Sequence, residues 1–281
     1  MKKWNLIIDV EKCEDCNNCF LACKDEHIGN DWPGYTVAQP LHGQRWINIM
    51  RKERGQYPQI DVAYRPTPCM HCDNAPCIKA ARDKAIYKRD DGIVIIDPQK
   101  AEGQKQVVDS CPYHAIWWNA EKNVPQKCTL CAHLLDDGWT QTRCTQVCPT
   151  GALQLVLAED SAMQDRVAAE NMEALDPRLN TRPRVWYRNL YRYTRCFIAG
   201  SVTIESNGAC DCAAGARVRL LKNANVIAET TSDGFGDFKF DNLEENSGVY
   251  TLEIDYKDFE KKTVEVELKE SVSVGDILLG K

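Results

Sequence analysis

The chain carries IIDVEKCEDCNNCFLAC at residues 7–23, and this stretch decides the fold of the first part of the protein. Its four cysteines have the spacing C-x2-C-x2-C-x3-C. In such a run three thiolates hold one [4Fe–4S] cluster and the fourth reaches a second cluster. Three cysteines fit a tight loop, whereas the fourth lies at the start of the following helix and points away from the loop. The run therefore predicts a partner motif elsewhere in the chain.

Further cysteine groups supply candidates for that partner. The segment 69–77 has three cysteines spaced C-x2-C-x4-C, and Cys111 stands before a proline. The segment 128–148 has four cysteines spaced C-x2-C-x12-C-x3-C and also ends before a proline.

We number the segments 7–23, 69–77, 95–111 and 128–148 as motifs one to four. Motif three is a damaged copy of motif one. Residues 95–111 read IIDPQKAEGQKQVVDSC and align with the opening stretch without a gap. Three of the four cysteine positions are occupied by Ala101, Gln104 and Val107, and only the last cysteine is kept. The repeat predicts two ferredoxin-like halves, one of which has lost a set of ligands.

The cysteines can be assigned to clusters because each triplet needs a fourth thiolate from a partner motif. The second motif would send its ligand from the position four residues after Cys77, which is Ala81. Pairing motif one with motif two would leave a three-ligand site, and pairing it with motif three would leave Cys23 without a cluster. Only the pairs one–four and two–three close, and the fourth site then loses all its ligands together. The predicted sets are Cys13, Cys16, Cys19 and Cys148 for cluster 1; Cys23, Cys128, Cys131 and Cys144 for cluster 2; and Cys69, Cys72, Cys77 and Cys111 for cluster 3.

Other uses of the fifteen cysteines fit less well. A disulfide framework needs an oxidising compartment and pairs cysteines in even numbers. A four-cysteine zinc site would suit the third set or the last motif alone, but not the opening run. His71, His114 and His133 lie beside ligands and are interpreted as packing or hydrogen-bonding groups.

Composition and charge exclude several classes of protein. The net charge of −6 provides no basic field for nucleic acid, so the basic and aromatic stretch at 182–193 is interpreted as an arm packed against a partner subunit. Apolar runs such as 152–158 are too short to span a membrane. We recognise neither a Sec signal nor a twin arginine, so we expect a cytoplasmic protein unless a partner's signal exports it.

The sequence pattern changes near residue 196, where the cysteine motifs give way to short alternating segments. The expected first domain spans 1–195, with an insert at about 28–65 and a C-terminal arm at about 160–195. The arm is expected to begin with an amphipathic helix over 160–175 that ends before Pro177.

The remainder, 196–281, is expected to be a β-sandwich, so the fold class is α+β. Seven short alternating segments separated by turn signals are the expected strands: 197–205, 216–221, 226–231, 235–240, 249–256, 262–268 and 274–279. Cys196, Cys210 and Cys212 lie outside any ligand pattern and are interpreted as free thiols.

The four-motif layout resembles the iron–sulfur subunits of the dimethyl sulfoxide reductase superfamily, which normally carry four clusters. The motifs that carry the likeness are DCNNC at 15–19, RPTPCMHC at 65–72 and CAHLLDD at 131–137. With three clusters, the chain is similar to the small-subunit family of pyrogallol–phloroglucinol transhydroxylase, and nearly as similar to resorcinol hydroxylase small subunits. The likeness covers the whole length and implies that the sandwich is of the carboxypeptidase-regulatory, immunoglobulin or transthyretin-like type.

The resemblance implies an electron-transfer subunit of a heterodimer that acts in anaerobic degradation of hydroxylated aromatics. The large partner subunit would carry molybdenum on bis(molybdopterin guanine dinucleotide) and the active site, and we assign no catalytic residue to this chain. Two alternatives stay open: a resorcinol hydroxylase subunit that passes electrons to an external acceptor, and a polyferredoxin-type redox or structural subunit. A higher oligomer of heterodimers also stays open.

The ligand assignment predicts the iron content. Protein purified without oxygen should contain about twelve iron atoms per chain, four for each of three clusters. Elemental analysis checks this: about sixteen iron atoms would restore the fourth site, and zinc in the third set would remove cluster 3 from the assignment.

Overall fold

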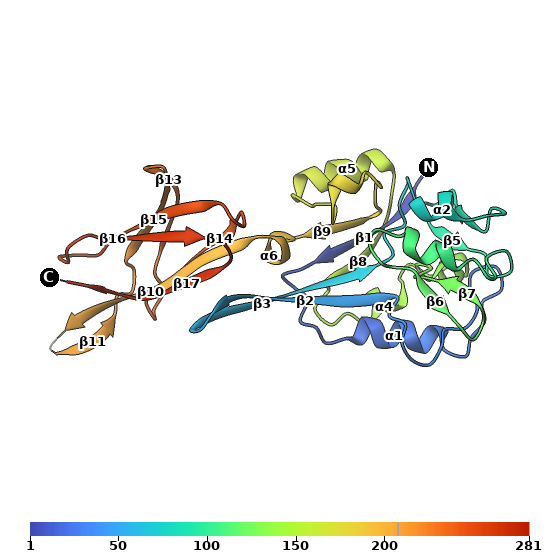
Figure 1. Ribbon diagram of the computed structural model, residues 1–281, viewed down its shortest axis with the longest axis horizontal. Coiled ribbons are helices and arrows are strands. Elements are labelled where there is room, and N and C mark those ends of the chain that lie inside the picture. The colour runs from blue at the N-terminus through green and yellow to red at the C-terminus, as the bar shows by residue number, and fades with distance from the viewer. Residues whose placement is uncertain (207, 281) are drawn as a thin grey trace. The chain divides into compact units, whose positions relative to one another are not determined.

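The computed structural model describes residues 1–206 and 208–280, and the chain divides into two compact units (Figure 1). Unit 1 comprises Met1–Met50 and Tyr64–Leu190, and unit 2 comprises Arg51–Ala63 and Tyr191–Lys281. Unit 2 thus contains a segment that the sequence analysis placed in the insert of the first domain. Within the described residues, no helix combines the length and apolarity that crossing a bilayer requires.

A three-stranded sheet in unit 1 brings the two ends of the cysteine-rich region together (Figure 1). The central strand β1 (Lys3–Asp9) pairs antiparallel with β8 (Leu153–Ala158) and parallel with β9 (Val185–Arg188). The Asp9 amide donates to the Ala152 carbonyl at 2.8 Å. Asp9 lies four residues before Cys13, and Ala152 lies four residues after Cys148, so this pairing brings the two cysteines to the same edge.

The internal repeat has a counterpart in the structure. Strand β4 (Ile86–Lys88) pairs antiparallel with β5 (Val94–Ile96), and the Asp97 amide donates to the Ala85 carbonyl at 2.8 Å. In the alignment of the two halves, this bond corresponds to the bond between Asp9 and Ala152.

The other elements of unit 1 are short and connect the cysteine motifs. The helices are α1 (Asn18–His27), α2 (Pro76–Ala80), η1 (Lys105–Ser110), α3 (Ala132–Asp136), α4 (Arg143–Gln146), α5 (Asp160–Ala169) and η2 (Pro177–Leu179). The hairpin of β6 (Trp117–Asn119) and β7 (Val124–Gln126) leads into the last cysteine motif.

Two expectations for the segment 160–195 need correction. Helix α5 ends at Ala169, because Asn171 adopts a left-handed φ of 50° and Glu173 forms a β-bridge with Tyr187 instead of a further helical turn. The stretch interpreted as an arm for a partner supplies β9 to the chain's own sheet. Tyr187 is fully buried there, and its hydroxyl donates to the Pro66 carbonyl at 2.9 Å.

Unit 2 contains two four-stranded sheets around one apolar core. One sheet has the order β11-β10-β14 with β17 also paired to β10, and the other has the order β13-β12-β15-β16. Alternate residues such as Val218 and Leu220, or Leu252 and Ile254, have no exposed surface and meet in the shared core. The strands are β10 (Cys196–Ser206), β11 (Ala209–Cys212), β12 (Arg217–Lys222), β13 (Asn225–Thr231), β14 (Asp237–Leu243), β15 (Gly248–Asp255), β16 (Lys262–Leu268) and β17 (Val272–Leu279).

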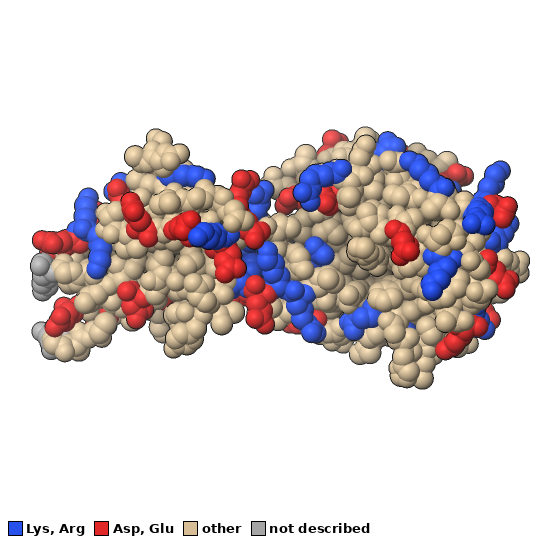
Figure 2. Space-filling model, viewed as in Figure 1, with Lys and Arg blue, Asp and Glu red and all other residues tan. Residues whose placement is uncertain are grey.

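Strand β11 is not among the expected strands, because all four of its residues are exposed and show no apolar alternation. Cys210 and Cys212 are exposed on this strand, and Cys196 is buried at the start of β10. On the face drawn in Figure 2, basic and acidic side chains are interspersed.

The tip of the hairpin of β2 (Ile47–Gln56) and β3 (Gln59–Pro68) belongs to unit 2. A Cβ added to Gly55 would lie 2.5 Å from the Phe197 ring, so the tip packs closely against β10. The buried Arg54 guanidinium forms a bidentate pair with Asp241, at 2.9 and 3.1 Å, and also contacts Asp61.

Two more cations complete this ion-pair network. Lys239 lies 3.0 Å from Asp61 and 3.2 Å from Asp241, and Arg192 lies 2.8 Å from Asp61. Burial works against the ionised form of Asp61, but Lys239, Arg54 and Arg192 outweigh it and lower its pKa to about 2. The network is therefore charged at neutral pH and ties the hairpin tip to β14.

We predict that Arg54→Met destabilises unit 2 by about 3–5 kcal/mol, because it leaves two carboxylates without their buried partner. Amide hydrogen exchange of the whole chain should then be faster in β10 and β14 by about two orders of magnitude or more. The matched control is Arg217→Met, which breaks the exposed pair with Glu229 and should not change exchange measurably. Equal exchange in the two variants would show that the network does not hold the tip.

Candidate metal centres

Three cavities in unit 1 are each lined by four of the twelve cysteines in ligand-spaced motifs. Their empty volumes, counted together with the open space at their mouths, are about 300, 380 and 340 Å³. We name them cavities 1, 2 and 3; they are lined by Cys13, Cys16, Cys19 and Cys148; by Cys23, Cys128, Cys131 and Cys144; and by Cys69, Cys72, Cys77 and Cys111, respectively. Each cavity takes thiols from two segments that are distant in the sequence.

Helix α1 divides its cysteines between two cavities. It begins at Asn18, earlier than expected, so Cys19 already lies in its first turn. Cys19 lines cavity 1, and Cys23, one turn later, lines cavity 2. Cys16 in the preceding loop is exposed.

The loops between paired cysteines share one local conformation. Leu130 and His71 have left-handed φ angles of 53° and 45°. These turns direct the Leu130 amide to the Cys128 sulfur at 3.3 Å and the His71 amide to the Cys69 sulfur at 3.5 Å. Amide donors to sulfur favour thiolates, and such bonds also set the reduction potentials of iron–sulfur clusters.

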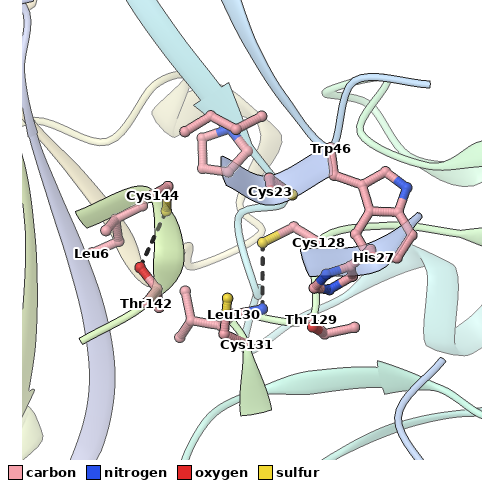
Figure 3. A pocket seen from close by; sticks show the side chains of 12 residues that line it. Leu6, Cys23, His27, Trp46, Cys128, Thr129, Leu130, Cys131, Thr142 and Cys144 are labelled. Carbon is pink, nitrogen blue, oxygen red and sulfur yellow. Dashed lines mark hydrogen bonds between the residues drawn. The ribbon is translucent and has the colours of Figure 1, made fainter. Parts of the chain in front are cut away.

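Cavity 2 shows how the thiols are enclosed (Figure 3). The four sulfurs come from α1, from the loop before α3 and from α4, while Trp46 and His27 form an apolar wall. The Thr142 hydroxyl lies 3.1 Å from the Cys144 sulfur. Thr142 also caps α4 and so fixes the turn that carries Cys144.

The thiols fit a cationic centre and are poorly suited to an empty cavity. Burial, with a smaller contribution from neighbouring thiols, raises the pKa of Cys19 and Cys128 to about 12 and that of Cys77 to about 11. Four such groups ionise together only when positive charge compensates them, and the thiolate is the form that binds metal. In the described residues no three Cys, His, Asp or Glu side chains converge as ligands of a single ion; each set of sulfurs instead surrounds a space, as a multi-atom cluster requires.

Cavity 2 has neighbours in both of the other cavities. Cys19 of cavity 1 and Cys144 of cavity 2 are close enough for the charge of Cys144 to raise the pKa of Cys19. Cys128 of cavity 2 is related in the same way to Cys69 of cavity 3.

Protein atoms fill the place where the repeat predicts a lost fourth site. Ala101 and Val107 are fully buried. The Gln104 amide nitrogen donates to the Lys100 carbonyl at 2.7 Å, and its oxygen accepts from the Arg82 amide at 2.8 Å. The side chain at a former ligand position thus holds together two loops that a cluster would otherwise connect.

The histidines beside the cysteines have other partners. The His71 ring nitrogen Nδ1 accepts from the Val94 amide at 3.0 Å, and burial lowers the pKa of His71 well below its usual range. His133 stacks on Trp32 and lies 3.0 Å from Glu26, and His114 is exposed.

Sequence reasoning missed Thr142, His27 and Lys127 as lining residues. Lys127 and Thr142 lie one and two residues before a predicted ligand. This closeness in the sequence is the only feature by which they could have been predicted to line a cavity.

The chain is similar to known iron–sulfur proteins. The model of the 4Fe-4S dicluster domain matches residues 60–158. The chain is 47% identical over 258 residues to the pyrogallol hydroxytransferase small subunit of Pelobacter acidigallici, covering 91% of each chain. It is 32% identical over 221 residues to a putative dimethyl sulfoxide reductase iron–sulfur subunit of Halobacterium salinarum, covering 67% of this chain and 80% of that one. A solved structure of Klebsiella pneumoniae 5-hydroxyisourate hydrolase matches 31% of the chain with a TM-score of only 0.25 and 15% identity.

The shared cavities predict which cysteine variants affect the same cluster. Cys148→Ser and Cys13→Ser should remove the same cluster signal in electron paramagnetic resonance spectra, and Cys23→Ser and Cys131→Ser should remove a different one. A double variant within one cavity should lose no further signal. Cys210→Ser, on exposed β11, is the control that keeps all signals. If Cys148→Ser and Cys131→Ser removed the same signal instead, the assignment would be wrong.

Proposed function

Because this chain belongs to the family of iron–sulfur subunits that includes the small subunit of pyrogallol hydroxytransferase, we propose that it is the electron-transfer subunit of a heterodimeric molybdenum enzyme acting on hydroxylated aromatics. We propose that its three cavities hold [4Fe–4S] clusters on the twelve cysteines that line them. Each cluster carries one electron. The single observation that supports this most directly is the presence of three cavities that are each lined by four thiols.

The chain's own residues supply enclosure and spacing. Buried side chains such as Trp46 and Ile47 keep water from cavity 2, and amide and hydroxyl donors fix the sulfur positions. Cys16 leaves cavity 1 the most open to the surroundings, since the other ligand positions are buried or half-buried. Cavity 2 has a thiol near a thiol of each of the other cavities, so it offers an electron a path between them.

The molybdenum on bis(molybdopterin guanine dinucleotide) is proposed for the large partner subunit, together with the active site. The cytoplasmic location and a further assembly of heterodimers are sequence-based parts of the proposal. We also propose an immunoglobulin or transthyretin-like topology for residues 196–281, supported by two four-stranded sheets around a shared core.

The partner can be tested by purification. The tagged chain, isolated without oxygen from its native host, should bring down a large subunit together with molybdenum in a one-to-one ratio with this chain. Isolation of the chain without molybdenum or a large subunit would favour the polyferredoxin alternative.

The substrate class is tested on that heterodimer. Incubation with pyrogallol should yield phloroglucinol with no net reduction of an added artificial acceptor, since a transhydroxylase moves a hydroxyl group between rings. Acceptor reduction with resorcinol, without phloroglucinol from pyrogallol, would instead assign the chain to the resorcinol hydroxylase type.

A further inference from the structure

A buried lysine lines cavity 3 and contacts the backbone of a residue that lines cavity 2. Lys127 follows β7 and directly precedes Cys128 of cavity 2, yet its side chain lines cavity 3. The residue is 3% exposed. Its ammonium group donates to the Cys128 carbonyl at 3.0 Å and to the Val94 carbonyl. These two bonds fix the ammonium group against the backbone of one residue that lines cavity 3, Val94, and one that lines cavity 2, Cys128.

The charge of Lys127 acts on both sets of thiols. In cavity 3 it opposes the larger effect of burial on the pKa of Cys77 and Cys111. In cavity 2 it does the same for Cys128. Lys127 lines neither cavity 1 nor cavity 2, and it is among the main influences on the pKa of Cys128 of cavity 2 but not on that of Cys13 or Cys19 of cavity 1.

No carboxylate in the described part of the chain pairs with Lys127. Lys88 provides the contrast, because it also approaches cavity 3 and donates to the Cys72 carbonyl at 3.1 Å. Lys88 lies 2.8 Å from Asp73, however, so its charge is largely compensated at short range. Of these two lysines, only Lys127 therefore has a charge that no nearby carboxylate among the described residues compensates.

We propose that Lys127 tunes the reduction potentials of two clusters. Its positive charge favours the reduced state of the clusters held in cavities 2 and 3. This inference rests on the proposed function, since it requires clusters in those cavities. Reduction adds one negative charge to a cluster, and Coulomb attraction to a buried cation is strong where water does not screen it. The charge therefore raises the reduction potentials of two neighbouring centres relative to the centre in cavity 1.

The test is a potentiometric titration, followed by electron paramagnetic resonance, of the heterodimer purified without oxygen. Lys127→Met should shift the reduction equilibrium of two clusters at least tenfold toward the oxidised state, about 59 mV downward for a one-electron couple. The third cluster is the internal reference and should keep its potential. Lys127→Arg, which retains the charge, should keep all three potentials near those of the unmodified protein.

Two further variants separate charge from structure. Lys127→Gln keeps a hydrogen-bond donor but removes the charge, and should shift the same two potentials as Lys127→Met. Lys88→Met is the matched control and should shift potentials less, because it removes a lysine already paired with Asp73.

Iron analysis distinguishes the ways in which the inference can fail. Unchanged potentials in neutral variants that retain all their iron would overturn the electrostatic role. Loss of a cluster from both neutral variants, but not from Lys127→Arg, would replace it with a role in holding the cavity together. Absence of clusters from the unmodified protein would overturn the proposed function itself.

Discussion

The structure of unit 1 depends on one constraint, namely that four thiols from two distant segments must surround each cavity. The β1–β8 pairing meets this constraint for cavity 1, because the hydrogen bond from Asp9 to Ala152 brings Cys13 and Cys148 to one edge. Helix α1 then carries Cys23 one turn onward to cavity 2. Residues that are far apart in the sequence thus line the same cavity. The short helices α3 and α4 lie beside cavity 2, which is lined by Cys131 before α3 and by Cys144 of α4.

The same crowding of thiols creates an electrostatic problem. Burial and mutual repulsion oppose ionisation of the cysteines, so amide donors, Lys127 and the proposed iron all act in one direction, toward the thiolate. At the position of the lost fourth site no thiols remain, and neutral hydrogen bonds from Gln104 are enough to connect the loops. Buried apolar residues and neutral hydrogen bonds thus occupy the place where the repeat predicts a fourth set of ligands.

Unit 2 relies on a different kind of closure. Its two sheets share an apolar core, but the segment Arg51–Ala63 reaches it from far back in the sequence. Arg54 is buried with two carboxylates that come from different parts of the chain, Asp61 and Asp241. A buried ion network is costly to form and costly to break, so it specifies one position for the hairpin tip on the β-rich unit.

The sequence by itself determined the cysteine grouping, the damaged repeat and seven of the strands of the C-terminal region, because regular spacing and alternation are local properties. It also led to the pairing of motifs by elimination, and ligation of iron by these cysteines stays a prediction. Only the tertiary structure decided that β9 completes the β1 sheet, that α5 stops at Ala169, that the hairpin tip belongs to unit 2 and that Lys127 lines cavity 3. Each of these depends on contacts between residues that are distant in the sequence. Such contacts form only when the chain folds, so local sequence patterns do not predict them.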